Sequence, residues 1–377
     1  MRITLISRAW PPSERSGVSL AAMSHAKLLL QQGHDVSIIG AENNLQAIPL
    51  PLSGRTCVPA KGSGSLYSPA RINQGRLKQA IASNKPELVI VEAWQTALTD
   101  SAIDVAYQLG IPVLMISHGI SMHPYKVSIP QYLRSLAWLP YRYLRLPGLV
   151  KKLNAITTLD ESSKSNRFFD RELAKKCLIP VVVLKNYSAH QMGEYVPRSK
   201  RQMQILVVGY FFPVKNQLAA INLMARLPFE ISCCFIGDRQ GRYFEECRTR
   251  VIDLKLNERI SFLQDDECNL AQKIAHSILI FSPSITEVLP ITLIEAMECG
   301  TPFVGTSVGA VKGFLGGIIA DDQESQLEAI QTLAFNPDIW QQFSDAGRKQ
   351  VSAEFTEERI ANQLKKAIHV AVAKGSA

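Results

Sequence analysis

Short apolar runs alternate with helical patterns along most of the chain, and this alternation constrains the fold more than any other feature. The first half contains expected strands at residues 3–7, 36–39, 88–91, 113–117, 157–159 and 181–184. The second half contains a further series at residues 205–208, 232–236, 260–263, 278–281 and 303–306. Buried strands separated by helices are typical of parallel sheets. We therefore predict an α/β protein with mostly parallel sheets.

The length of the chain predicts two domains. A chain of 377 residues is too long for one ordinary hydrophobic core. The polar segment 189–202, interrupted by Pro197, lies between the two series of strands and is typical of a linker. We predict one domain at residues 1–190, a second at residues 203–355, and a C-terminal helix at residues 356–377.

Composition excludes several classes of protein. Hydrophobic residues make up 46% of the chain and charged residues 20%, as in soluble globular proteins. The apolar run at residues 3–6 is too short for a signal peptide, and no run approaches the length of a membrane span. The seven cysteines are scattered without a C-x-x-C pair, which favours a reducing cytoplasm and argues against metal or disulfide roles. The net charge of +8 is compatible with anionic substrates or an anionic membrane surface.

The segment 284–302 contains the strongest functional signal. Glu287 and Glu295 are separated by seven residues; Glu287 is expected on the loop after a strand, and Glu295 about one turn into a helix. That helix is expected to start near Thr292 and to stop at Gly300. Its N-terminus offers unpaired N–H groups and a positive dipole end, which suit phosphate. Two carboxylates that can bind hydroxyl groups, next to a helix N-terminus that can bind phosphate, indicate a nucleotide-sugar site.

This segment resembles the E-x7-E motif of the family 4 retaining glycosyltransferases, a glycogen-synthase-like group. The matching positions are Ser284, Glu287, Pro290, Glu295, Ala296, Met297, Gly300 and Pro302. The resemblance implies the GT-B fold, with two Rossmann-like domains facing across a cleft and a C-terminal helix crossing back to the first domain. It also implies transfer of one sugar from a nucleoside diphosphate sugar to a hydroxyl of a glycan or lipid-linked glycan. No metal and no cofactor other than the nucleotide sugar is expected.

The resemblance also assigns roles around the donor. Glu287 is expected to orient hydroxyls of the donor sugar as a catalytic residue, and Glu295 to bind the ribose. Lys215, after the strand at 205–208, matches the lysine that grips the donor diphosphate, while Tyr210 stands where the family has an arginine. Val288 stands where the family usually has glycine. The remaining expected donor contacts are Leu289, Thr292, Gly237 and Gly17.

His118 ends the strand at 113–117 and is followed by Gly119, as in the H-G pair of the family. A histidine there is expected to hydrogen-bond the transferring sugar, so we predict His118 as a second catalytic residue. His123 is a candidate for facing the acceptor. For Gly17, a plain turn before a helix is an equally good interpretation.

The stretch 132–152 mixes aromatic residues, leucines and basic residues without a single acid. It fits an interfacial helix on an anionic lipid surface, with the enzyme peripheral on the inner membrane face, or core packing with an exposed basic side. No nucleic-acid motif accompanies the charge. Two rival functions stay open: a catalytically silent GT-B binding or scaffold protein, which Tyr210 and Val288 do not exclude, and a GT-B nucleotide-sugar epimerase. A dinucleotide-binding protein is disfavoured because no G-x-G-x-x-G follows the first strand.

Overall fold

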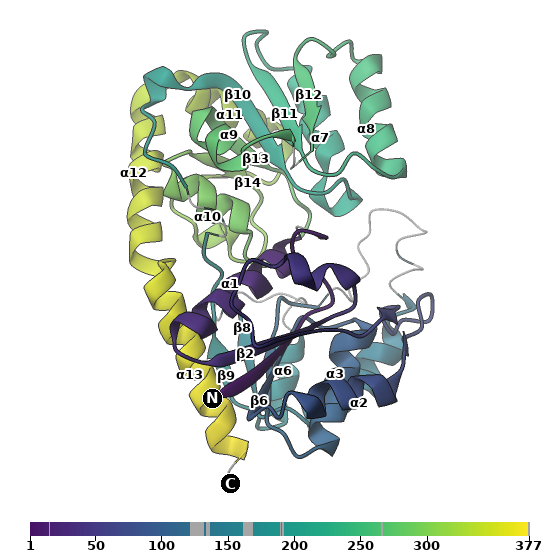
Figure 1. Ribbon diagram of the computed structural model, residues 1–377. Coiled ribbons are helices and arrows are strands. Elements are labelled where there is room, and N and C mark those ends of the chain that lie inside the picture. Colours follow the sequence, from purple (N-terminus) through teal and green to yellow (C-terminus); the bar gives the residue numbers. More distant parts are fainter. Residues whose placement is uncertain are drawn as a thin grey trace. The chain divides into compact units, whose positions relative to one another are not determined.

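The structure is a computed structural model that describes residues 1–375 except 15, 121–131, 133–135, 161–168, 189, 191 and 265–266. The chain forms two compact units (Figure 1). Unit 1 contains Met1–Asn186 and Glu358–Ala377, and unit 2 contains Tyr187–Glu357.

Unit 1 is built on a seven-stranded parallel sheet in the order β3-β2-β1-β6-β7-β8-β9. The strands are β1 Arg2–Ile6, β2 Asp35–Gly40, β3 Gly54–Cys57, β6 Leu88–Glu92, β7 Val113–Ile116, β8 Ala155–Thr158 and β9 Val181–Val183. A short antiparallel pair, β4 Ala60–Lys61 and β5 Arg71–Ile72, lies outside this sheet. The central strands are buried along their whole length, as parallel strands covered by helices on both faces require.

Three helices of unit 1 begin at side chains that accept hydrogen bonds from their first N–H groups. Ser16 caps α1 Gly17–Gln31, Asn73 caps α2 Gln74–Ser83 and Thr96 caps α3 Ala97–Gln108. The others are α5 Leu146–Val150, which follows a π-helical turn at Tyr141–Arg145, α6 Phe169–Lys176 and α13 Glu357–Gly375.

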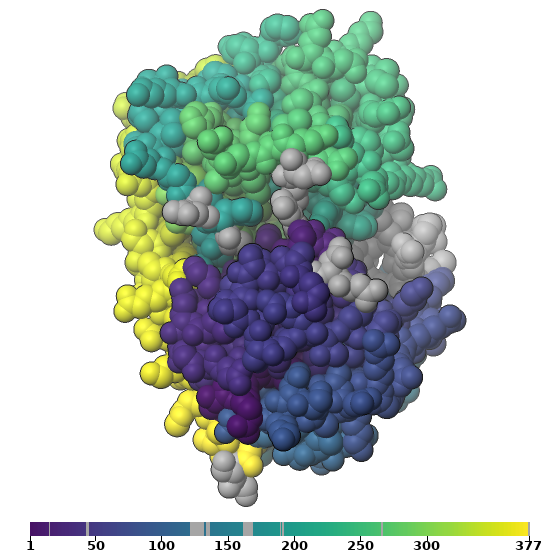
Figure 2. All heavy atoms as spheres, viewed as in Figure 1, coloured from purple at the N-terminus to yellow at the C-terminus, as the bar shows by residue number. Residues whose placement is uncertain are grey.

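Helix α13 joins unit 1 although it ends the chain. Its apolar face, including Ile360 and Leu364, is fully buried. The amide of Gln32 donates to the carbonyl of Ala361 at 2.8 Å. In the space-filling view the yellow C-terminal residues lie against the purple N-terminal part of unit 1 (Figure 2).

Unit 2 contains a six-stranded parallel sheet in the order β12-β11-β10-β13-β14-β15. Its strands are β10 Gln202–Val208, β11 Ser232–Ile236, β12 Ile260–Leu263, β13 Ser277–Ser282, β14 Phe303–Gly305 and β15 Gly317–Ile319. Its helices are α7 Gln217–Met224, α8 Arg242–Asp253, α9 Leu270–His276, α10 Ile291–Glu298, α11 Gln323–Phe335 and α12 Pro337–Glu354.

Arg201 belongs to the core of unit 2, although the sequence places it in the expected linker. It is 8% exposed, and its guanidinium donates to the carbonyls of Ser277 and Cys299 at 3.2 and 3.0 Å. The same group lies 4.9 Å from the ring centroid of Trp340. The positive charge thus ties β13 and the end of α10 together through backbone acceptors.

The predicted α/β class is confirmed, and each predicted strand overlaps a strand of the structure. The short strands β3 and β15 and the antiparallel pair β4 and β5 were missed. In both sheets the strand order reverses beside the first strand, between β1 and β6 and between β10 and β13. Such reversal points open a crevice at the carboxyl ends of the strands, where α/β proteins bind ligands.

Candidate functional site

Lys215 and Glu287 meet at the reversal point of unit 2. Lys215 ends a short 3-10 turn after β10, and Glu287 lies on the loop after β13. Because β10 and β13 are neighbours in the sheet, the two loops leave from adjacent strand ends. The ammonium Nζ of Lys215 lies 2.5 Å from Oε1 of Glu287, and the side chains are 31% and 14% exposed. The structure therefore brings together the two residues predicted for the donor diphosphate and the donor sugar.

The Glu287 loop is held by backbone hydrogen bonds from both neighbouring loops. The N–H of Ile285 donates to the carbonyl of Val214 at 2.8 Å, and the N–H of Ala310 donates to the carbonyl of Val288 at 2.9 Å. Gly309 has φ +54°, and a Cβ there would lie 2.4 Å from the Glu287 carbonyl oxygen. Gly309 was missed in the sequence, because its role depends on the approach of the Glu287 backbone, which no local pattern shows.

Val288 and Leu289 direct their side chains into the protein, since each is only 5% exposed. Only the backbone of these two residues can therefore contact a donor. The Val288 carbonyl already accepts a hydrogen bond from the N–H of Ala310. Thr292 lies half-buried in the first turn of α10. The first turn of α10 contains no acidic side chain to compete with an anion for its N–H groups.

The turn after β10 depends on two glycines. Gly209 has φ +141°, a backbone conformation that residues with a side chain rarely adopt. A Cβ on Gly237 would lie 2.3 Å from the Gly209 carbonyl oxygen. Gly237 therefore has a structural role in this turn. The carbonyl of Tyr210 accepts from the amide of Gln217 at 2.9 Å.

Glu295 lies in the second turn of α10 with its side chain 2% exposed. Its Oε1 lies 2.6 Å from Nδ1 of His190, a ring that is 35% exposed. His190 was missed because it falls in the segment that the sequence indicates as a linker. The carboxylate of Glu295, which we predicted to bind the ribose, is thus hydrogen-bonded to the imidazole of His190.

In unit 1, His118 is one of two imidazoles on a buried carboxylate. Glu92 ends β6 with its side chain fully buried; Oε1 lies 2.7 Å from Nδ1 of His25 and Oε2 lies 2.8 Å from Nε2 of His118. Burial alone would raise the pKa of Glu92, but the charge of His25 and the hydrogen bonds from both rings outweigh it and lower the pKa to about 2. Glu92 and His25 were missed in the sequence, although an acid directly after a buried strand was visible.

A second buried carboxylate fixes the turn that bears His118. Asp170 is 1% exposed and accepts from Nε1 of Trp94 at 2.8 Å and from the hydroxyl of Ser117. Burial raises the pKa of Asp170, and these hydrogen bonds oppose the rise. The N–H of Gly119, at φ +80°, donates to Ser117 Oγ at 3.1 Å. The residues on both sides of His118 are therefore anchored.

Gly17 begins α1 and is exposed. A Cβ there would meet no atom within 4 Å, so the local packing does not require glycine. Ser16, which replaces the first glycine of the family's pair, caps the helix by accepting from the N–H of Ser19 at 3.3 Å. His123 lies outside the described residues.

The basic stretch at 132–152 is partly packed and partly exposed. Arg145 and Lys152 each lie 2.5 Å from a carboxylate oxygen of Asp104, and Tyr141 is 1% exposed. Tyr143 and Leu144 point outward, with 62% and 78% exposure. Core packing thus explains part of the pattern. Arg134 lies outside the described residues.

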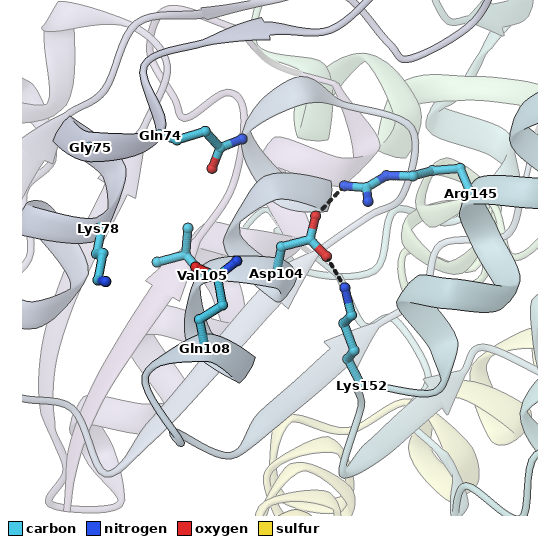
Figure 3. A pocket seen from close by; sticks show the side chains of 8 residues that line it. All are labelled: Gln74, Gly75, Lys78, Asp104, Val105, Gln108, Arg145 and Lys152. Carbon is cyan, nitrogen blue, oxygen red and sulfur yellow. Dashed lines mark hydrogen bonds and ion pairs between the residues drawn. The ribbon is translucent and has the colours of Figure 1, made fainter.

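Asp104 also borders a surface pocket of about 420 Å³ on the helices of unit 1 (Figure 3). Lys78, Arg145 and Lys152 line it with three positive charges against one carboxylate. This pocket lies on α2, α3 and the segment around α5. This cationic cluster is separate from the strand ends that bear Glu92 and His118.

Across the residues that the structure describes, no group of three or more His, Cys, Asp or Glu side chains is arranged to hold a metal ion. None of the described helices combines the length and apolar character needed to cross a bilayer.

Residues 194–350 match the family described as Glycosyl transferases group 1. This match covers most of unit 2, Tyr187–Glu357, and includes Lys215, Glu287 and Glu295. N-acetyl-alpha-D-glucosaminyl L-malate synthase of Bacillus anthracis is 26% identical over 172 residues, which are 44% of this chain and 45% of that protein. The chain thus matches about half the length of this curated relative.

Two solved structures share the fold along nearly the whole chain. Sucrose-phosphate synthase from Thermosynechococcus elongatus superposes with a TM-score of 0.75 at 18% identity, covering 97% of this chain and 98% of that one. HepE of Anabaena, solved in complex with UDP-glucose, superposes with a TM-score of 0.71 at 16% identity, covering 97% of this chain and 99% of that one. The chain therefore has the GT-B fold, which the family resemblance implied.

Proposed function

We propose that this protein is a retaining glycosyltransferase of the family 4 type. It moves one sugar from a nucleoside diphosphate sugar to a hydroxyl on a glycan or lipid-linked glycan. The observation that carries the proposal is the Lys215–Glu287 pair, which lies at the strand-order reversal of the group 1 glycosyl transferase domain. A nucleotide sugar contains both phosphate groups and sugar hydroxyls. The Lys215 cation suits the phosphate, and the neighbouring Glu287 carboxylate suits the sugar hydroxyls.

The donor groups then have defined places in unit 2. Lys215 and the N-terminus of α10 hold the diphosphate, because both present positive charge to an anion. Glu287 orients the sugar hydroxyls, and Glu295 binds the ribose in competition with His190. Since Tyr210 supplies no cation at the position of the family's arginine, Lys215 carries most of the cationic contact.

UDP-sugars are the first donors to test, because the structural neighbour HepE was solved with UDP-glucose. The decisive experiment screens purified protein against UDP-, GDP- and ADP-sugars by thermal shift, followed by product analysis with Lys215→Ala as the comparison. A bound donor raises the melting temperature according to ln(1 + [L]/Kd). Stabilisation of the wild type by one nucleotide sugar, lost in Lys215→Ala, supports the proposal. Equal stabilisation of both proteins contradicts it.

The same preparation separates the two rival functions. A silent GT-B scaffold protein binds nucleotide without consuming the sugar donor, and an epimerase converts the donor with no acceptor present. A transferase releases nucleoside diphosphate in an acceptor-dependent reaction. Release that does not depend on any acceptor of a glycan or glycolipid panel, together with a changed donor sugar, would favour the epimerase.

We further propose that the enzyme is cytoplasmic and rests on an anionic membrane surface through the exposed part of residues 132–152. Tyr143 and Leu144 expose apolar surface beside Arg142 and Arg145, a combination that suits an anionic lipid interface. Sedimentation with phosphatidylglycerol liposomes at low salt tests this proposal. Tyr143→Ser with Leu144→Ser should release the protein, and wild-type protein that stays in the supernatant refutes it.

A further inference from the structure

The buried cluster of Glu92, His25 and His118 is larger than a sugar contact by His118 requires. Glu92 stands at the strand-order reversal of unit 1, at the end of β6. His25 comes from α1 and His118 from the turn after β7, and their ring exposures are only 2% and 8%. A buried charge is costly, and an apolar substitute of similar volume is often as stable. Packing alone therefore gives no reason for an acid at this position.

The cluster determines which nitrogen of His118 carries a proton. An ionised carboxylate only accepts hydrogen bonds, so each ring nitrogen that contacts Glu92 must donate. His118 therefore carries hydrogen on Nε2, and His25 carries hydrogen on Nδ1. When the His118 ring is neutral, its Nδ1 is a lone-pair acceptor. Among the described residues, Nδ1 of His118 has no hydrogen-bond partner.

The location of His118 directs this acceptor to the ligand end of the sheet. The ring follows β7, which is paired to β6, so it lies at the carboxyl edge where ligands bind in such sheets. Ser117, held by Asp170, and Gly119 keep the turn in one conformation. An imidazole with a fixed tautomer in a fixed turn offers one acceptor in one direction, which suits a hydroxyl group.

We propose that Glu92 and His25 are positioning residues that hold His118 in the Nε2–H tautomer and present its Nδ1 as a hydrogen-bond acceptor to a substrate hydroxyl. The tautomer follows from the cluster itself, and only the substrate hydroxyl rests on the proposed function. Glu92 acts on His118 through one ring nitrogen. His25 holds the second carboxylate oxygen, so that the carboxylate cannot turn away from His118.

The first test is spectroscopic and needs no substrate. Full-length protein labelled with 15N-histidine is examined by long-range 1H–15N correlation at pH 8, with the His118 signals assigned from His118→Gln. The expected spectrum shows a protonated Nε2 and an unprotonated Nδ1 on His118. A proton on Nδ1 with a bare Nε2 overturns the proposal whether or not the protein transfers sugar.

The second test separates positioning from packing. Glu92→Gln presents one donor and one acceptor, so it cannot hold both rings in their present tautomers. We expect kcat to fall at least about tenfold, as when an outer partner of a functional histidine is lost, while the affinity of unit 2 for UDP stays unchanged. The matched control is Glu87→Gln, an exposed acid just before the same strand, which should change neither quantity. An unchanged kcat in Glu92→Gln refutes the positioning role, and absence of turnover in the wild type refutes the proposed function instead.

Discussion

Replacement of Glu287 by glutamine should tighten nucleotide binding while it slows sugar transfer. The Lys215 ammonium is 2.5 Å from the Glu287 carboxylate, so a diphosphate must compete with Glu287 for this cation. The side chains are 31% and 14% exposed, so the pair is partly solvated. Its interaction free energy should lie near the upper end of the range for surface ion pairs, about 1 kcal/mol. Removal of that competition corresponds to about a fivefold lower Kd for UDP. Turnover should fall at least about tenfold, because a contact that acts on the reacting sugar is lost.

Isothermal titration with UDP at fixed ionic strength measures the first effect, and single-turnover kinetics measures the second. Glu328→Gln on α11 is the matched control, since it removes one exposed carboxylate from the same unit. The control should leave the Kd of UDP and the rate of transfer unchanged. Weaker UDP binding in Glu287→Gln, or an equal gain in the control, would refute the competition between Glu287 and the phosphate.

Two further substitutions test other parts of the structure. Gly309 has φ +54°, and Gly309→Ala places a Cβ 2.4 Å from the Glu287 carbonyl oxygen. The rate of sugar transfer should therefore fall at least about tenfold. The control is Gly313→Ala, whose Cβ meets no atom within 4 Å and which should transfer sugar at the normal rate. Asp100→Asn should raise the melting temperature at pH 8 but not at pH 4. Burial raises the pKa of Asp100 from 3.8 to about 7. The free energy of unfolding of the wild type therefore falls by about 4 kcal/mol at most as the pH rises between these values. Equal melting temperatures of the wild type and Asp100→Asn at pH 8 would count against this.

The positions of Lys215 and Glu287 at strand ends were predictable because the sequence signals are local. Lys215 and Glu287 each follow a strand that the apolar pattern reveals, and parallel strands bring their carboxyl ends to one edge. The family resemblance supplied their roles. What the sequence could not give is which strands are neighbours, and hence that these two side chains form an ion pair.

The partners of the predicted residues were not predictable for the same reason. His25 and Glu92 are 67 positions apart, and their contact depends on how α1 crosses the sheet. His190 is 105 positions from Glu295 and lies in a polar segment that has no periodicity to place it. Gly309 matters only because the backbone of another loop approaches it, which no local pattern reveals.

A crystal structure with a bound nucleoside diphosphate decides whether Lys215 and the N-terminus of α10 hold the phosphates of the donor. We expect the β-phosphate within about 3 Å of Lys215 Nζ, beside the first turn of α10, with the Lys215–Glu287 contact lengthened. A diphosphate bound instead among Lys78, Arg145 and Lys152 in the pocket of unit 1, with the Lys215–Glu287 pair intact, would contradict it.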